Sequence, residues 1–163
     1  MQREYPSAPV AAVACVVLRE GAEGRLEVLL VRRGQAPSYG RWGLPGGAIE
    51  LGEGTREAAA REVREECGIE VAPDRVIEVL DAITKDQAGK IRYHYVLIEF
   101  LAEYQGGELR PSSDALDARW FALEELSGID MQEITRRVIW AGAALRQKGA
   151  EGGPRLWQSA FWS

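Results

Sequence analysis

Residues 55–68 read "TREAAAREVREECG", and this stretch says more about the fold than any other part of the chain. Its small and apolar residues recur at intervals of three and four, which is the spacing of one buried face of a helix. Thr55 can serve as the N-cap, and Gly68 stands where a left-handed residue ends a helix. We therefore predict a helix from Thr55 to Cys67. The residues expected on its buried side are Ala59, Ala60, Val63 and Cys67.

The same helix gathers like charges on another side. Glu62 and Glu66 are four positions apart and Glu65 is three from Glu62, so all three carboxylates project together. At about 5 Å and an effective dielectric near 20, each pair repels by roughly 3 kcal/mol before screening. Carboxylates in such a group are ligands for hard divalent cations such as Mg²⁺ or Mn²⁺, which would turn the repulsion into attraction.

An ordinary solvated helix face is the alternative explanation of these glutamates. Pairs such as Glu57 with Arg61 and Arg61 with Glu65 have helical spacing, and each would contribute a few tenths of a kcal/mol. For three glutamates alone we would favour that explanation. The residues around them decide between the two.

Length and composition bound the kind of protein. A chain of 163 residues, 46% hydrophobic and 28% charged, predicts one soluble globular domain over 1–163, with a core at about 8–147 and an aromatic tail at 149–163. A net charge of −5 argues against a nucleic acid polymer as partner. No apolar run approaches a membrane span of about 20 residues. Cys15 and Cys67 form no disulfide framework, and we expect two buried thiols in a cytoplasmic protein.

The rest of the chain alternates strand-like runs with turns and contains a second helix. Residues 9–19 and 26–33 are expected to form an antiparallel hairpin, followed by a long Gly-Pro loop at 34–47. Further strands are expected at 75–83, 91–104 and 118–123, and the second helix at 130–148. The pattern predicts an α/β fold with a mixed sheet between helices. The apolar stripe of the second helix is Met131, Ile134, Val138, Ala141 and Leu145.

From Gly47 to Ile69 the chain reads "GAIELGEGTREAAAREVREECGI". This segment resembles the Nudix box of the Nudix hydrolases, G-x5-E-x7-R-E-U-x-E-E-x-G-U, where U is aliphatic. The resemblance implies a Nudix-type α/β/α sandwich and a metal-dependent hydrolase. Every specified position of the pattern is matched, by Gly47, Glu53, Arg61, Glu62, Val63, Glu65, Glu66, Gly68 and Ile69.

The resemblance also implies a role for each residue of the box. Glu62 and Glu66 are expected to be the principal ligands of Mg²⁺ or Mn²⁺, together with the carbonyl of Gly47. Glu65 is expected to bridge metals or to deprotonate water. The catalytic group is completed by Arg61, which would orient carboxylates because it does not lose its proton, and Glu53, which would position the loop or the ligands.

Other side chains are candidates for binding substrate. Arg32, Arg33 and Arg41 flank the Gly-Pro loop and could hold phosphates through paired hydrogen bonds, although surface arginines are common. Trp42 could stack on a base or ribose, or could pack within the fold. These four residues are therefore candidates with a structural alternative.

The catalytic base lies outside the box in several Nudix relatives. Glu99, Asp114 and Asp117 are the available carboxylates here. Glu99 shares a strand face with two tyrosines and is a candidate substrate-binding residue at the wall of a site, or else a charge on an edge strand. The two aspartates are expected to cap their loop.

The expected substrate is a nucleoside diphosphate linked to another group. The "LPGG" at 44–47 and the "DARWFALEEL" at 117–126 resemble the ADP-ribose and ADP-sugar branch, although Lys85 occupies the region where some ADP-ribose hydrolases have a proline. Dimers are frequent in that branch, and the oligomeric state stays open between monomer and homodimer. A nucleoside triphosphate pyrophosphohydrolase is the runner-up, followed by a non-catalytic nucleotide sensor and an acidic protein-interaction domain.

Overall fold

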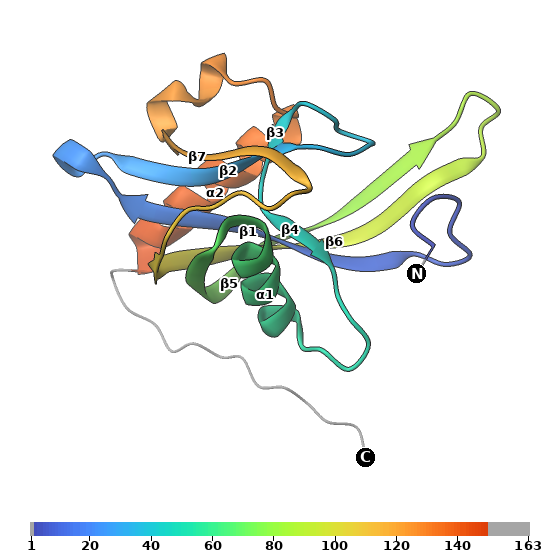
Figure 1. Ribbon diagram of the computed structural model, residues 1–163, viewed down its shortest axis with the longest axis horizontal. Helices are drawn as coiled ribbons and strands as arrows, with labels where there is room; N and C mark the ends of the chain where they lie inside the picture. The colour runs from blue at the N-terminus through green and yellow to red at the C-terminus, as the bar shows by residue number, and fades with distance from the viewer. Residues whose placement is uncertain (1, 150–163) are drawn as a thin grey trace.

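The computed structural model describes residues 2–149, which form one large sheet and two α-helices (Figure 1). The helices are α1 (Thr55–Cys67) and α2 (Glu133–Gly149), and short 3-10 turns lie at Ala22–Gly24 and Leu123–Gly128. The strands are β1 (Val10–Glu20), β2 (Leu26–Arg33), β3 (Trp42–Gly43), β4 (Gly46–Ala48), β5 (Ile69–Lys85), β6 (Ile91–Gly107) and β7 (Ala115–Ala122).

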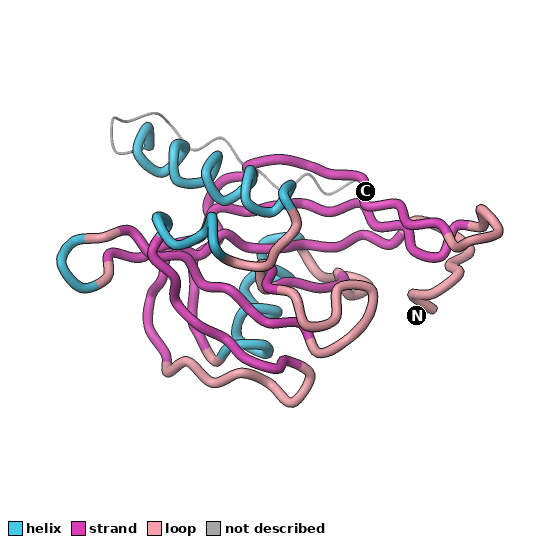
Figure 2. Tube along the Cα trace, turned by 90° about the horizontal axis from the view of Figure 1, so that it is seen from above, coloured by secondary structure: helices cyan, strands magenta, loops and turns pink. Residues whose placement is uncertain are grey.

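The sheet is mixed. Its strands run in the order β3-β2-β1-β6-β5, with β4 also pairing with β1 and β7 with β2. The pairing of β1 with β6 is parallel, and the other strand pairs are antiparallel. Figure 2 shows α1 and α2 on opposite sides of this sheet. The predicted α/β class, with a mixed sheet between helices, is therefore confirmed.

Strand β1 is buried on both of its faces, which explains its uninterrupted apolar sequence. Alternate residues of a strand point to opposite faces, so one set packs toward α1 and the other toward α2. The predicted hairpin with β2 is present, and both cysteines are buried free thiols as expected. The residues toward α1 are Val13, Cys15 and Val17, and those toward α2 are Ala14, Val16 and Leu18.

The segment 34–47 was predicted to be a loop, and that prediction was wrong in part. Strand β1 pairs with β2 only from Leu18 to Glu20, and nearer its N-terminal end, at Ala12–Ala14, it pairs with β4 instead. Strand β3 fills the corresponding place beside β2. The glycines that suggest a loop allow this backbone to lie close against its neighbours, so the segment completes the sheet where β1 and β2 separate.

Helix α1 has the predicted bounds, Thr55–Cys67, but its N-cap differs from the prediction. Gly54, not Thr55, is the N-cap, and its N–H donates to the Glu57 carboxylate at 2.9 Å. The helix ends at Cys67, and its C-cap Gly68 has a φ of 70°, the predicted left-handed conformation. Ala58 is buried together with three of the predicted residues, whereas Ala60 is half-buried.

The apolar stripe predicted for α2 is rotated in the structure. Ile134 is 38% exposed and Ala141 is also exposed. The helix approaches the sheet through Gly142, where a Cβ would lie 2.9 Å from the Cδ1 of Ile77. The helix therefore packs on the sheet with the face that carries Gly142. The spacing of large apolar residues did not predict which face would be buried. The buried residues are Val138, Ile139 and Gly142.

The aromatic tail, with Trp157, Phe161 and Trp162, lies outside the described residues. Within residues 2–149, no helix is both long and apolar enough to cross a membrane. The described chain therefore positions one acidic helix, α1, beside the short strand β4 and leaves a long β5–β6 hairpin projecting from the body (Figure 1).

Candidate active site

The acidic face of α1 lies against the backbone of β4. A Cβ built at Gly47 would lie 2.6 Å from the carboxylate of Glu62, so a residue with a side chain at this position would collide with that carboxylate. One turn further along the helix, the Gly46 N–H donates to the Oε2 of Glu66 at 3.3 Å. The two glycines therefore let the backbone of β4 come within reach of two carboxylates of the box.

Arg61 is surrounded by the other acidic residues of the box. Its Nε donates to Glu53 at 2.6 Å, and its Nη1 donates to Glu62 at 2.9 Å and to Glu65 at 3.1 Å. Its Nη2 donates to the carbonyl of Ala48 at 3.1 Å. Hydrogen bonding to Glu53 is the main cause that raises the pKa of Arg61 and lowers the pKa of Glu53. Arg61 thus ties the loop before α1 to the acidic face of the helix.

Within residues 2–149, no three side chains of histidine, cysteine, aspartate or glutamate are grouped closely enough to hold a metal ion. Repulsion keeps carboxylates apart when the positive charge between them is a single guanidinium. The donor set nevertheless fits a hard divalent cation, because Glu62 lies against a backbone position with no side chain and Glu65 is 59% exposed. To bind a cation, Glu62 and Glu65 would have to release their hydrogen bonds from Arg61 and turn toward the metal.

Glu66 is the buried carboxyl of this group. Burial raises its pKa to about 7, and nearby Glu62 and Asp114 add to that effect. Arg33 and the Gly46 N–H act in the opposite direction. A carboxyl with such a pKa is divided between its two protonation states near neutral pH, and a bound divalent cation would hold it in the charged state.

Glu99 lies in the interior and not on an edge strand. Its strand β6 has β1 on one side and β5 on the other, and the residue is 4% exposed. Burial raises its pKa to about 7, with Arg33 lowering it. Its Oε2 is buried and has no hydrogen-bond partner in the described part of the chain. The alternative of an edge-strand charge is therefore wrong.

The candidate substrate-binding residues are not all near α1. The Nε of Arg32 donates to the Gly40 carbonyl at 2.9 Å, and Arg41 pairs with Asp130 at 3.2 Å. Trp42 packs edge-on against Phe121, with ring centroids 4.9 Å apart. These three side chains are held by other parts of the fold. The fourth of these candidates, Arg33, donates to the Leu44 carbonyl at 3.1 Å and lies near enough to Glu66 to lower its pKa.

Two features of the site were missed or misjudged in the sequence. The Gly46 N–H, which bonds Glu66, was not considered, although the doubled glycine at 46–47 was a visible signal. Asp114 was predicted to cap its loop, yet it lies near enough to Glu66 to raise its pKa. Asp117 does bond locally, accepting from the Ala118 N–H at 2.8 Å.

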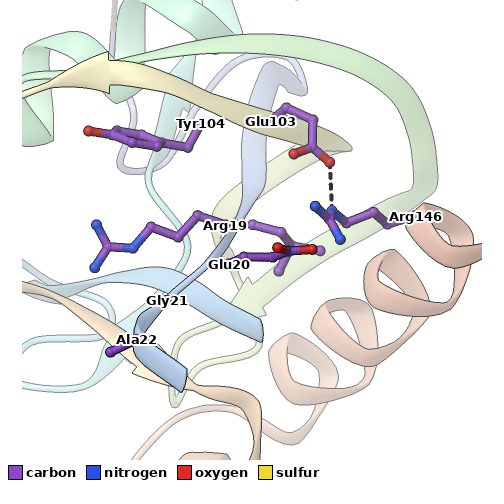
Figure 3. Close-up of a pocket in the computed structure, with 8 residues that line it drawn as sticks. Arg19, Glu20, Gly21, Ala22, Glu103, Tyr104 and Arg146 are labelled. Carbon is purple, nitrogen blue, oxygen red and sulfur yellow. Dashed lines mark hydrogen bonds and ion pairs between the residues drawn. The ribbon is translucent and has the colours of Figure 1, made fainter. Parts of the chain in front are cut away.

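A hollow of about 630 Å³ lies at the other end of β1, away from the box (Figure 3). The arginines around it are already paired, Arg146 with Glu103 at 2.7 Å and Arg19 with Glu27 at 2.7 Å. Arg19 also lies over the ring of Trp120, with its Cζ 4.0 Å from the centroid. The size of this hollow therefore does not mark it as the active site. The carboxylates that share an arginine lie at the other end of β1, beside β4.

A family model places the sequence among known proteins. The model of the NUDIX domain matches residues 8–140, which is most of the chain. This match spans every strand from β1 to β7 and the whole of α1.

Individual proteins are also similar to this chain. An ADP-ribose pyrophosphatase of Methanocaldococcus jannaschii is 35% identical over 61% of this chain and 57% of that relative. An NAD-capped RNA hydrolase NudC of Stutzerimonas stutzeri is 31% identical over 71% of this chain and 39% of that relative. The chain thus spans less than two thirds of the length of either curated relative.

A solved structure shares the fold at lower identity. The NUDIX domain of Shewanella oneidensis NrtR, solved in complex with ADP ribose, superposes with a TM-score of 0.69 and is 21% identical. The match covers 87% of this chain and 90% of that one. At this identity the similarity establishes the architecture, an α/β fold with a mixed sheet between two helices.

Proposed function

The chain belongs to the Nudix family, and we propose that it hydrolyses the pyrophosphate linkage of a nucleoside diphosphate bonded to a second group, with Mg²⁺ or Mn²⁺ as cofactor. The observation that carries this proposal is the complete box, whose Glu62 carboxylate lies where Gly47 has no side chain. Glu53, Glu62 and Glu65 all pair with the one guanidinium of Arg61, an arrangement that a domain without a metal would not need.

The residues that would hold the cation are Glu62, Glu66 and the carbonyl of Gly47, with Glu65 beside them. When bound, a divalent cation neutralises phosphate charge, polarises the P–O bond and makes water more acidic. Oxygen ligands of this kind suit Mg²⁺ and Mn²⁺. The sequence positions of these ligands follow from the box, and their approach to β4 supports the proposal.

The remaining residues of the box would act on these ligands and on protons. Arg61 bonds Glu53 and the Ala48 carbonyl, and so holds the loop before α1 in place relative to the helix. In hydrolysis the oxygen of water joins phosphorus, the P–O–P linkage breaks, and the proton of the water must be accepted. Among the box carboxylates that pair with Arg61, Glu65 has the most exposed side chain, and we assign proton acceptance to it.

ADP-ribose is the proposed substrate. The resemblance of 44–47 and 117–126 to the ADP-sugar branch supports it, as does the 35% identity to an ADP-ribose pyrophosphatase. An NAD cap on RNA contains the same type of linkage. The net charge of −5 opposes the approach of an RNA polymer, which favours a small molecule.

A product screen tests the proposal. The purified chain would be incubated with Mg²⁺ or Mn²⁺ and with ADP-ribose, ADP-sugars, NAD-capped RNA and nucleoside triphosphates, and products would be identified by mass. The expected result is AMP and ribose 5-phosphate from ADP-ribose. Pyrophosphate released from triphosphates alone would favour the runner-up. Metal-dependent binding of a non-hydrolysable ADP-ribose analogue without any cleavage would favour a sensor, and no binding would favour an interaction domain.

A further inference from the structure

The outermost strand of the sheet carries an exposed row of apolar side chains. Strand β5 is the last in the order β3-β2-β1-β6-β5, and within residues 2–149 only β6 pairs with it. Its side chains Val76, Val79 and Ile83 are 37%, 56% and 50% exposed. They stand opposite alternate residues of β6, among them Phe100 and Ile98, which pack in the core toward α1. Residues opposite one another share a face, so all three lie on the α1 side of β5, and we call them the apolar strip.

Helix α1 lies over the first part of β5 and not over the apolar strip. Arg56, in the first turn of the helix, donates to the Asp74 carbonyl at 2.7 Å, and the helix runs from there back to the start of β5 at Ile69. The strip lies further along, where the β5–β6 hairpin projects from the body (Figure 1). Aliphatic side chains on the free edge of a sheet favour association with another segment. We therefore looked for a segment that would cover them.

The C-terminal segment of this chain starts beside the same strand. Helix α2 ends at Gly149, where a Cβ would collide with the guanidinium of Arg75 on β5. Residues 150–163 follow, and these fourteen residues reach about 46 Å when extended. The stretch of β5 from Arg75 to Ile83 is about 26 Å long. The segment is therefore long enough to reach every residue of the apolar strip.

The composition of this segment suits the strip. Residues 150–154 include two glycines and a proline, which is typical of a linker. Asp81 is exposed and lies between Val79 and Ile83 on the same side of β5, opposite Val96. Residues 155–163 begin with a cation, Arg155, which complements that carboxylate. The large apolar side chains of residues 155–163 are Leu156, Trp157, Phe161 and Trp162.

A second copy of β5 is a poorer partner for this edge. The pairing of β5 shifts in register between Pro73 and Arg75 and again between Val76 and Glu78. Bulges of this kind, and a proline without an N–H, interrupt regular pairing of one edge strand with another. We propose that residues 155–163 dock on the apolar strip of their own chain and so cover the free edge of the hairpin. This inference uses neither a metal nor a substrate and is independent of the proposed function.

Paramagnetic relaxation in the full chain tests the docking. A nitroxide is attached to Ala160→Cys, which is the accessible thiol because Cys15 and Cys67 are buried. Amide signals are compared between the oxidised and the reduced label in a ¹⁵N-labelled sample. We expect loss of the signals of residues 76–83 with the oxidised label. The signals of β7, which pairs with β2 and not with β5, should stay unchanged.

Val79→Ser provides the matched test of the apolar strip. Val79 is 56% exposed, so the substitution leaves the core intact, and it removes the apolar surface at the centre of the strip. The ratio of docked to free segment should fall by roughly tenfold, which corresponds to one valine left unburied, and the signals of 76–83 should return. Trp140→Ser is the control, because Trp140 is 49% exposed on α2, away from the strip. Its substitution should leave the signals lost.

Three results would overturn the inference. The first is retention of the signals of 76–83 with the oxidised label, and the second is loss centred on Trp140 instead. The third is seen in a mixture of ¹⁵N-labelled chain without nitroxide and unlabelled chain with it. Loss of the signals of 76–83 in this mixture would place the segment on a second copy, whereas we expect them to be retained. The proposed function stands whichever result is obtained.

Discussion

The two ends of β1 both carry arginines and carboxylates, yet they differ in how the charges are matched. Near Leu18–Glu20, Arg19 pairs with Glu27 and Arg146 with Glu103, so each cation has its own anion. Near Ala12–Ala14, where β4 pairs with β1, each of two arginines is shared by several carboxylates. Arg61 is shared by Glu53, Glu62 and Glu65, and Arg33 acts on Glu66 and Glu99.

This difference identifies the site better than shape does. The end with matched charges contains the hollow of about 630 Å³ (Figure 3), whereas the end with surplus negative charge lies against β4. Paired surface charges contribute little and call for no further ligand. A surplus of buried and half-buried carboxylates has a cost that a divalent cation would remove. Substitutions at the two ends of β1 should therefore differ in their effects on activity and stability.

Glu66→Gln should abolish most turnover. The amide keeps the size of the side chain and its bond from the Gly46 N–H, but removes the charge that would bind a cation. We expect kcat on the true substrate to fall on the order of a thousandfold, with the fold intact. Steady-state kinetics with Mg²⁺, compared with Glu103→Gln at the other end, measure this. Turnover within a few-fold of the wild type would refute the role of Glu66.

Stability should fall with rising pH when no divalent cation is present. Burial raises the pKa of Glu66 and of Glu99 from an ordinary 4.5 to about 7, so the folded state binds more protons than the unfolded state between these values. The contribution of each group to stability is therefore present at low pH and is lost as the pH rises through 7. Between pH 5 and 7 the free energy of unfolding should fall by at most about 3 kcal/mol per group.

Urea unfolding at pH 5 and pH 8 checks this pH dependence. Glu99→Gln should remove the share of Glu99 and flatten the curve, and added Mg²⁺ should restore stability at pH 8 through Glu66. Carboxyls with lowered pKa, such as Glu53, act only at lower pH and leave this window unaffected. A wild-type chain that gains stability from pH 5 to 8 without metal would contradict the account.

Gly47→Ala should impair the site without unfolding the chain. The new Cβ would lie 2.6 Å from the Glu62 carboxylate, which must then move away from the β4 backbone. We expect roughly tenfold weaker Mg²⁺ activation, because the carboxylate and the Gly47 carbonyl no longer face one cation. Gly128→Ala is the control, since no atom lies within 4 Å of a Cβ at that position. Equal behaviour of the two variants would argue against this placement of the cation.

Glu103→Gln should have the smallest effect. It breaks a partly exposed pair with Arg146 at the matched end of β1. The free energy of unfolding should fall by about 0.5 kcal/mol, and kcat should not change. A loss of activity comparable to that of Glu66→Gln would remove the distinction between the two ends. Chemical denaturation and steady-state kinetics on one preparation measure both quantities.

The sequence predicted those parts of the fold that depend on local pattern. The 3.6-residue spacing in α1, the left-handed Gly68 and the apolar run of β1 each reflect a short-range rule, and the structure agrees with them. The prediction failed where distant elements decide the conformation. Gly142 faces the sheet, where a Cβ would lie 2.9 Å from the Cδ1 of Ile77 in another strand.

The site was predicted unevenly for the same reason. The box places Glu62, Glu65 and Glu66 on one helix, so a local pattern suffices to group them. Arg32 and Arg33 are adjacent in sequence and Arg41 follows after a loop, yet of these three only Arg33 is near enough to lower the pKa of Glu66. Arg32 instead bonds the Gly40 carbonyl, and Arg41 pairs with Asp130. The burial of Glu99 depends on the parallel pairing of β1 with β6, which no short window of sequence contains.

Anomalous diffraction from a crystal soaked in Mn²⁺ and a non-hydrolysable ADP-ribose analogue tests the central claim most directly. The claim is that the surplus negative charge beside β4 is a cation site. The account predicts a manganese peak in contact with the carboxylates of Glu62 and Glu66 and with the carbonyl of Gly47. A structure in which the analogue is bound, these carboxylates still pair with Arg61 and Gly46, and no manganese lies beside them would contradict it.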